Sequence, residues 1–198
     1  LISLLMEMDR VLVTFSGGVD STLLLAVAQK TLGNNAVAMT AVSGTLPEAE
    51  YDEARELAKE LGAVHHLVDS HELEKDGYRK NGADRCFHCK TELYSLALAK
   101  AQDLSIDWVV DGCNLDDLGD YRPGRAAAAD HGVRSPLIEA KLTKQEIRTI
   151  SAAMQLRTAR KAAFACLGSR FPYGTEITSG RLQQIAACEQ YLRDAGFH

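Results

Sequence analysis

Three cysteines are the residues of this chain whose type and spacing most directly suggest chemistry. Cys86 and Cys89 form a Cys-x-x-Cys pair at the start of a predicted helix, and Cys166 lies in a glycine-containing, loop-like segment. The helix dipole favours thiolates at that position, and both sulfurs can reach one metal ion. With Cys166 as a third ligand, three thiolates and one open position suit a 4Fe-4S cluster. A structural zinc with His88 or His71 as fourth ligand, a redox dithiol and three unrelated buried thiols remain open alternatives.

The other two cysteines are interpreted as packing residues. Cys113 follows Gly112 in a tight loop, and Cys188 shares a helix face with Ile185 and Leu192. Both are ordinary positions for a small apolar side chain.

The segment SGGVDS at residues 16–21 joins a predicted strand to a predicted helix. Free backbone amides and the positive end of the helix dipole face such a loop, which is an arrangement that binds phosphate. Gly17 and Gly18 allow close approach of the backbone, and the hydroxyls of Ser16 and Ser21 can donate further hydrogen bonds. The segment is not a Walker A loop, because no Gly-Lys-Ser/Thr follows, and it does not match GxGxxG. An ordinary glycine turn capped by Asp20 or Ser21 is the structural alternative.

The elements that position these residues alternate between strand and helix. Apolar, β-branched runs predict strands at residues 11–15, 36–42, 63–68 and 107–111, and helical spacing predicts helices at 21–32, 47–61 and 86–102. This alternation predicts an α/β fold with a parallel, doubly wound sheet. Ligands then bind at the carboxyl ends of the strands, which are Ser16, Ser43, Asp69 and Gly112.

Beyond Ala140 the sequence predicts helices alone. Thr143 and Glu146 form a capping box that opens a helix to about residue 154, and Thr178 opens another that ends before Gly196. We therefore expect an α/β domain at residues 1–140 and a helical segment at 141–198 that leads into a C-terminal region outside this chain.

The charge balance favours a small-molecule partner. The chain has 22 Lys and Arg against 27 Asp and Glu, a net charge of -5, which is the wrong sign for holding nucleic acid. No apolar run is long enough to cross a bilayer, and the opening LISLLMEMDR carries acidic residues where a signal peptide is basic. We expect a cytoplasmic protein that binds neither membrane nor nucleic acid. Because Leu1 is not a start methionine, we expect the natural chain to extend beyond this sequence.

The SGGVDS loop after an apolar strand resembles the PP-loop of the ATP pyrophosphatase (N-type) superfamily. That superfamily cleaves ATP between the α and β phosphates, adenylylates a carboxylate or an oxo carbon, and releases pyrophosphate. The resemblance implies ATP and Mg²⁺ as cofactors, with Asp20 as a catalytic residue near the magnesium. It also implies the following ATP and pyrophosphate contacts: Ser16, Gly17, Gly18, Asp20, Ser21, Ala41, Ser43 and Gly112.

Four further blocks extend the resemblance over almost the whole chain. They are ADRCFHCK (83–90), DGCNLDDLGDYRPG (111–124), RSPL (134–137) and FACLGSRFPYGTEIT (164–178). With SGGVDS, they resemble the ATP-dependent sulfur transferases of nickel-pincer cofactor biosynthesis, the LarE family. The resemblance implies that ATP activates a carboxylate of pyridinium-3,5-biscarboxylic acid mononucleotide, which then receives sulfur. In one branch of the family the cysteine at the position of Cys166 gives up its own sulfur, and in another Cys86, Cys89 and Cys166 hold a 4Fe-4S cluster that carries the sulfur.

Polar residues elsewhere are candidates for magnesium or the anionic substrate. Carboxylate and amide oxygens after the fourth strand suit magnesium, although a helix cap and a solvated acidic loop would have the same composition. The candidates for magnesium or the substrate are Asn114, Asp116, Asp117, Arg122, Arg170 and Glu189. Asp111 is a further candidate oxygen ligand in the segment after the fourth strand. We also expect the protein to form a homo-oligomer.

Two other functions compete with this interpretation. A PP-loop tRNA thiolase also combines this loop with Cys-x-x-Cys and a distant cysteine, but it needs a basic RNA surface, which the net charge of -5 argues against. A non-catalytic module that binds ATP or AMP would use the cysteines structurally.

Overall fold

Four parallel strands form the centre of this computed structural model, which describes residues 1–119 and 123–197. The strands are β1 (Val11–Thr14), β2 (Ala36–Val42), β3 (Val64–Asp69) and β4 (Trp108–Val110), in the order β3-β2-β1-β4. In the middle of β1, Val13 is in register with Ala38 of β2 and with Val110 of β4. The chain thus winds from β1 to β3 in one direction and returns to place β4 on the other side of β1. This reversal creates a crevice at the carboxyl ends of β1 and β4, where open α/β sheets bind ligands.

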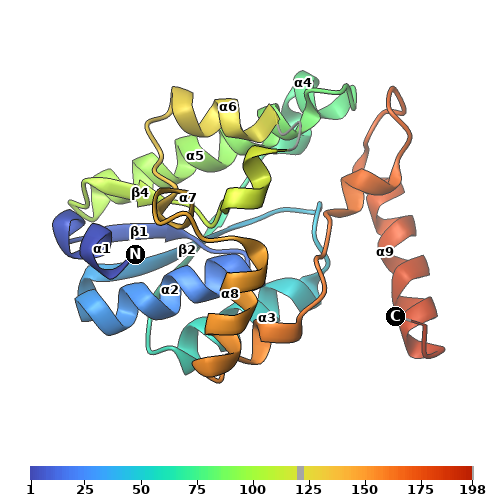
Figure 1. Cartoon of the computed structure of the whole chain (residues 1–198). Helices are drawn as coiled ribbons and strands as arrows, with labels where there is room; N and C mark the ends of the chain where they lie inside the picture. The colour runs from blue at the N-terminus through green and yellow to red at the C-terminus, as the bar shows by residue number, and fades with distance from the viewer. Residues whose placement is uncertain (120–122, 198) are drawn as a thin grey trace.

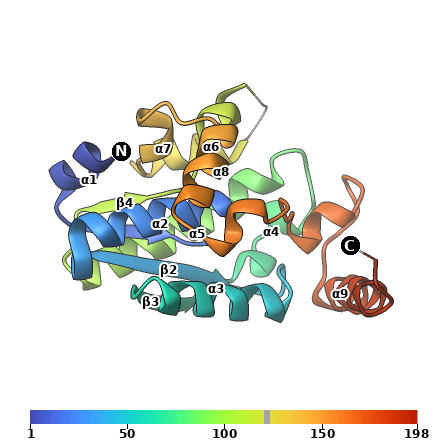
Figure 2. The same cartoon turned by 60° about the horizontal axis from the view of Figure 1, so that its bottom comes forward.

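Helices cover both faces of the sheet, as the doubly wound prediction requires (Figures 1 and 2). One core packs α1 (Ile2–Met8), α2 (Val19–Leu32), α3 (Glu48–Glu60) and α8 (Lys144–Ala153) against one face. A second core packs α5 (Arg85–Asp103) and α6 (Pro123–Asp130) against the other. The side chains of β1 alternate between these cores, with Val11 and Val13 in the first and Leu12 in the second. The α/β fold with a parallel, doubly wound sheet is therefore confirmed.

Shorter elements connect these layers. They are η1 (Gly33–Asn35), η2 (Glu72–Glu74), α4 (Asp76–Arg79), η3 (Leu115–Leu118), α7 (Pro136–Glu139), η4 (Arg157–Arg160) and η5 (Leu167–Arg170). The sequence pattern did not predict these short turns or α1, because three to seven residues are too few to establish a periodicity.

The part of the chain after residue 140 that the structure describes contains helices and turns but no strand, as expected. The capping box at the start of α8 is present, with Thr143 Oγ1 accepting from the Glu146 amide and the Glu146 carboxylate accepting from the Thr143 amide. The last helix, α9 (Ser179–Asp194), lies to one side of the sheet and helices (Figure 1). Leu182 is its buried residue. The interpretation of Cys188 as a packed residue is wrong: its side chain is exposed on this helix. None of the helices in the described ranges is long and apolar enough to cross a membrane.

Candidate nucleotide and sulfur site

The loop between β1 and α2 has the geometry of an anion site. The amide of Gly18 donates to Ser16 Oγ at 3.4 Å, and Ser16 Oγ lies 3.1 Å from Ser21 Oγ. Gly17 has a φ of 68°, a left-handed conformation that glycine adopts without steric cost. Gly18 is the N-cap of α2 and no side chain caps the helix, so Asp20 and Ser21 do not act as its caps. The first amides of α2 are thus available to a ligand rather than to a capping side chain.

Gly112 lies against this loop. A Cβ atom on Gly112 would lie 2.9 Å from the amide nitrogen of Ser21 and 3.1 Å from its Cα atom. These are backbone atoms, which cannot move aside as the end of a flexible side chain can. Glycine at this position therefore lets the end of β4 approach the start of α2 and completes the crevice between the two strands.

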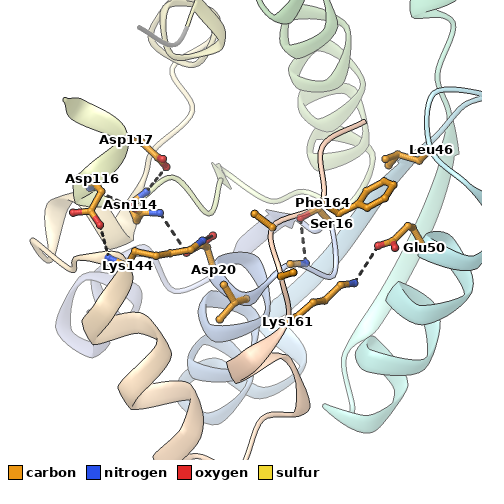
Figure 3. A pocket seen from close by; sticks show the side chains of 14 residues that line it. Ser16, Asp20, Leu46, Glu50, Asn114, Asp116, Asp117, Lys144, Lys161 and Phe164 are labelled. Carbon is orange, nitrogen blue, oxygen red and sulfur yellow. Dashed lines mark hydrogen bonds and ion pairs between the residues drawn. The ribbon is translucent and has the colours of Figure 1, made fainter. Parts of the chain in front are cut away.

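A cavity of about 430 Å³ opens beside the loop, within the size range of small-molecule sites (Figure 3). On one side, Lys144 Nζ donates to Asp20 Oδ2 at 2.5 Å, and Asn114 Nδ2 donates to Asp20 Oδ1 at 3.3 Å. The backbone amide of Lys144 donates to Asp116 Oδ2 at 3.0 Å. Asp20 thus contacts the Lys144 ammonium group and Asn114, while Asp116 is held by the backbone of Lys144.

Lys161 lies on the other side of the cavity (Figure 3). Its Nζ atom donates to Glu50 Oε2 at 3.1 Å and to Glu53 Oε2 at 2.6 Å, both on α3. It also lies 3.4 Å from the carbonyl oxygen of Gly17. This cation therefore contacts the phosphate loop itself. Lys144 and Lys161 were missed from the sequence, because neither belongs to a recognisable motif.

The acidic segment after β4 divides into two parts with different surroundings. Asp117 accepts from the Asn114 amide at 3.0 Å and forms the capping box of η3, while its side chain also lines the cavity. Asp111 does not line the cavity. Its buried carboxylate accepts from Tyr94 Oη at 2.6 Å and from Ser135 Oγ at 2.7 Å. We conclude that Asp111 holds β4 to α5, whereas Asn114, Asp116 and Asp117 remain candidates for magnesium.

The candidates at the end of β2 lie beside a buried carboxylate. Ser43 Oγ donates to Glu72 Oε1 at 2.5 Å, and Thr45 Oγ1 donates to the same oxygen at 3.0 Å. Tyr51 Oη donates to the Ser43 carbonyl at 2.7 Å. Ala41 lies in the half-buried last part of β2. Neither Ala41 nor Ser43 lines the cavity, so their contact with adenine stays a prediction.

A buried guanidinium ties the Cys-x-x-Cys pair to the segment that carries Cys166. Arg85, 7% exposed, donates to the Gly168 carbonyl at 2.7 Å and to Asn81 Oδ1 at 2.8 Å. Arg85 Nη2 also lies 3.9 Å from Cys86 Sγ. Asn81, fully buried, donates in turn to the Pro172 carbonyl at 2.9 Å. These bonds fix the start of α5 against η5, although more than 80 residues separate them in the sequence.

The three cysteines share one region and differ in exposure. Cys86 is exposed, while Cys89 and Cys166 are partly buried. Burial, together with the Glu72 carboxylate, raises the pKa of the Cys89 thiol to about 12. Within residues 1–119 and 123–197, no three Cys, His, Asp or Glu side chains are placed to share one metal ion. Metal binding by the three cysteines therefore stays a prediction.

Residues 161–166 connect the cavity with the sulfur region. Lys161 and Phe164 line the cavity, and Cys166 follows two residues later. The guanidinium carbons of Arg170 and Arg193 each lie 5.6 Å from the centre of the Phe164 ring. Arg170 Nε donates to Glu189 Oε1 at 2.6 Å, so this predicted pair is in contact. Arg122 lies outside the described residues.

Comparison with known proteins identifies the family. A solved NH3-dependent NAD synthetase from Campylobacter jejuni covers 98% of this chain and 83% of its own, with a TM-score of 0.61 and 15% identity, which shows a common fold. The asparagine synthase family model matches residues 3–75, the part that contains the phosphate loop. The pyridinium-3,5-bisthiocarboxylic acid mononucleotide synthase of Lactiplantibacillus plantarum is 38% identical over all of this chain and 72% of its own length. This chain belongs to the same family, the LarE family.

The LarE family comprises PP-loop, ATP-dependent sulfur transferases, so this protein is an adenylylating enzyme of that class. An uncharacterized protein of Synechocystis sp. is 46% identical over 97% of this chain, and the chain again covers 72% of that relative. The expected resemblance and enzyme class are therefore confirmed. The roles of individual residues stay predictions, argued below.

Proposed function

We propose that this LarE-family chain uses ATP to adenylylate a carboxylate of pyridinium-3,5-biscarboxylic acid mononucleotide, releases pyrophosphate and inserts sulfur to give the thiocarboxylate. The single observation that carries this proposal is the segment 161–166, which lines the nucleotide cavity at Lys161 and Phe164 and ends at Cys166. A carboxylate is a poor electrophile, whereas an acyl-adenylate carries AMP as a leaving group. An activated carboxylate in this cavity would lie beside the segment that supplies the sulfur.

The cavity supports the activation step through its distribution of charge. The open amides at the start of α2 would bind the pyrophosphate, and Lys161 would exchange its contacts with Glu50 and Glu53 for a phosphate oxygen. Asp20, Asn114 and Asp116 offer the oxygen ligands that Mg²⁺ prefers. The Asp20 carboxylate now contacts the Lys144 ammonium group, a positive charge that Mg²⁺ would replace as its partner. Magnesium would neutralise the phosphates and orient them for attack by the carboxylate on the α-phosphorus.

The sulfur step is assigned to the three cysteines. We propose that Cys86, Cys89 and Cys166 hold a 4Fe-4S cluster, with a sacrificial Cys166 as the alternative. A cluster binds its cysteine ligands on separate irons, so it requires three thiolates around one rim rather than on one ion. The hydrogen bonds of Arg85 to Gly168 and Asn81 support this assignment, because they hold the two cysteine-bearing segments together. When bound, the cluster would supply an open iron that carries an additional sulfide.

The contacts of the two cavity lysines support a division of the chain near residue 140. We propose residues 1–140 as the PP-loop domain and residues 141–198 as a helical segment that completes its site. Lys144 and Lys161 both belong to the second part and both line the cavity formed by the first. The substrate is a small molecule, and we propose a soluble, cytoplasmic homo-oligomer.

The test is pyrophosphate release by the anaerobically purified protein with ATP and Mg²⁺. We expect release with the pyridinium dicarboxylate mononucleotide and none with bulk tRNA. Asp20→Ala should abolish the release, while the exposed Asp107→Ala should leave it unchanged. Release that depends on tRNA would identify a thiolase, and ATP binding without release would identify a nucleotide sensor.

Iron content, acid-labile sulfide content and intact mass distinguish the two sulfur sources. If a cluster carries the sulfur, the wild type contains iron and acid-labile sulfide and turns over repeatedly, and Cys86→Ala loses all three properties. A sacrificial Cys166 instead loses the elements of hydrogen sulfide after one turnover, and Cys86→Ala retains that turnover. Stoichiometric zinc without iron in active, anaerobic protein would return Cys86 and Cys89 to a structural role.

A further inference from the structure

The hydroxyl group of Tyr78 is buried beside the cysteines without a hydrogen-bond partner. Tyr78 lies in α4, is 1% exposed, and forms a small core with Leu167, Ile177 and Leu182. Its Oη atom is inaccessible to solvent, and no donor or acceptor in the described part of the chain pairs with it. Buried phenol groups ordinarily find a partner, since an unmade hydrogen bond is costly. Tyr94, a second fully buried tyrosine, donates to Asp111 at 2.6 Å.

The hydroxyl group of Tyr78 and the sulfur of Cys166 lie on the same side of Gly168. A Cβ atom on Gly168 would lie 2.7 Å from Tyr78 Oη and 3.7 Å from Cys166 Sγ. No side chain at residue 168 therefore separates the two atoms. Cys89 packs against the same small core from the start of α5. The unpaired donor thus lies close to Cys166, in a core that Cys89 also contacts.

The chemistry of the missing acceptor follows from this position. A phenol O–H group donates its hydrogen bond to an electron-rich acceptor atom. The nearby groups that would become negatively charged during sulfur transfer are the sulfurs of the cysteine site. A thiolate, a persulfide or a metal-bound sulfide accepts such a bond more strongly than a neutral thiol, because a charged acceptor strengthens it.

We propose that Tyr78 donates a hydrogen bond to the anionic sulfur that the enzyme transfers, and that glycine at residue 168 keeps a side chain from coming between Tyr78 Oη and Cys166 Sγ. This inference rests on the proposed sulfur site at Cys86, Cys89 and Cys166. Tyr78 is then a group that touches the reacting sulfur and stabilises its negative charge before attack.

The test compares the thermal unfolding of empty and sulfur-loaded protein. Wild type, Tyr78→Phe and Tyr94→Phe are loaded anaerobically, in one arm with ferrous iron and sulfide and in the other with polysulfide and no iron. Acid-labile sulfide measures loading in the first arm, and sulfane sulfur released by cyanide measures it in the second. Whichever arm loads the wild type identifies the source as a cluster-bound sulfide or a persulfide.

We expect Tyr78→Phe to leave the unfolding temperature of the empty protein unchanged or higher, because it removes an unpaired buried hydroxyl. Tyr94→Phe should lower it, because it breaks a bond to Asp111. Loading with sulfur should raise the unfolding temperature of the wild type by several degrees more than that of Tyr78→Phe. Tyr78→Phe should also lose its bound sulfur to a chelator or to cyanide about ten times faster than the wild type does.

Three results would overturn the proposal. Equal gains on loading would show that the hydroxyl does not touch the sulfur. An empty Tyr78→Phe as unstable as Tyr94→Phe would show that the hydroxyl already has a partner. A wild type that loads in neither arm would remove the sulfur site, and persistent pyrophosphate release would then show that the activation step stands without it.

A second variant tests the close approach of Gly168 to Tyr78 directly. Gly168→Ala places its Cβ atom 2.7 Å from Tyr78 Oη, so it should unfold at a lower temperature and load no sulfur. Adding Tyr78→Phe removes the clashing oxygen and should recover the stability but not the loading. A double variant as unstable as Gly168→Ala would contradict the position of the hydroxyl beside Gly168.

Discussion

Replacing Gly112 with alanine would place a methyl group against the backbone at the start of α2. The added Cβ atom would lie 2.9 Å from the amide nitrogen of Ser21, a distance that real side chains essentially never show. Either β4 or the phosphate loop must then shift by several tenths of an ångström. Overpacking of this kind costs about 1–3 kcal/mol of unfolding free energy. In a chain of this size, each kcal/mol lowers the unfolding temperature by about 2–4 °C.

The effect on activity should exceed the effect on stability. Displacement of groups that bind and align a reacting substrate by about 1 Å can reduce a rate by about 100-fold. We therefore expect Gly112→Ala to remain folded and to release pyrophosphate at least 10 times more slowly. Gly119→Ala is the matched control, since its Cβ atom would meet its nearest neighbour at an ordinary 3.8 Å. The assay measures pyrophosphate release and thermal unfolding on the same preparations, and equal values for the two variants would refute the close approach as the reason for glycine at residue 112.

Three further changes test other parts of the structure. Lys161→Met should raise the KM for ATP about tenfold by removing a charge-assisted bond to phosphate, while the exposed Lys59→Met should not change it, and equal KM values would exclude Lys161 from the site. Arg85→Met should lower the free energy of unfolding in urea by about 2–4 kcal/mol, because it leaves Asn81 and a carbonyl oxygen buried without a donor. Burial, with neighbouring positive charge, lowers the pKa of His65 below 6.5, so stability should be full above that pH and should fall as the pH drops towards the lowered pKa. Urea unfolding between pH 5 and pH 8 should show this slope in the wild type and a flatter one in His65→Gln.

Local patterns were sufficient to predict the sheet and the phosphate loop. The strand predicted at residues 36–42 coincides with β2, and the predicted capping box opens α8. These features depend on neighbouring residues, whose side-chain period and backbone preferences are visible in the sequence. The phosphate loop could be identified because its residue types and their spacing form a contiguous sequence motif.

The cavity's cations could not be predicted in this way. Lys161 contacts the Gly17 carbonyl from 144 residues away, and its neighbours in the sequence do not distinguish it from surface lysines. Asp111 also lies in the acidic motif, yet its carboxylate bonds to Tyr94 and Ser135 inside the protein, which the sequence does not indicate. The direction in which an individual side chain points depends on packing between distant segments.

Residues 161–166 form neither helix nor strand, and they link the lysine beside the phosphate loop to Cys166. A chain spans at most about 3.3–3.6 Å per residue, so the distance from Lys161 to Cys166 has a fixed upper limit. In the proposed mechanism, this limit keeps the activated carboxylate within reach of the sulfur. One residue inserted into this segment would raise the limit by about 3.3–3.6 Å. We expect such an insertion to leave adenylylation intact while the activated carboxylate is lost to water before sulfur reaches it.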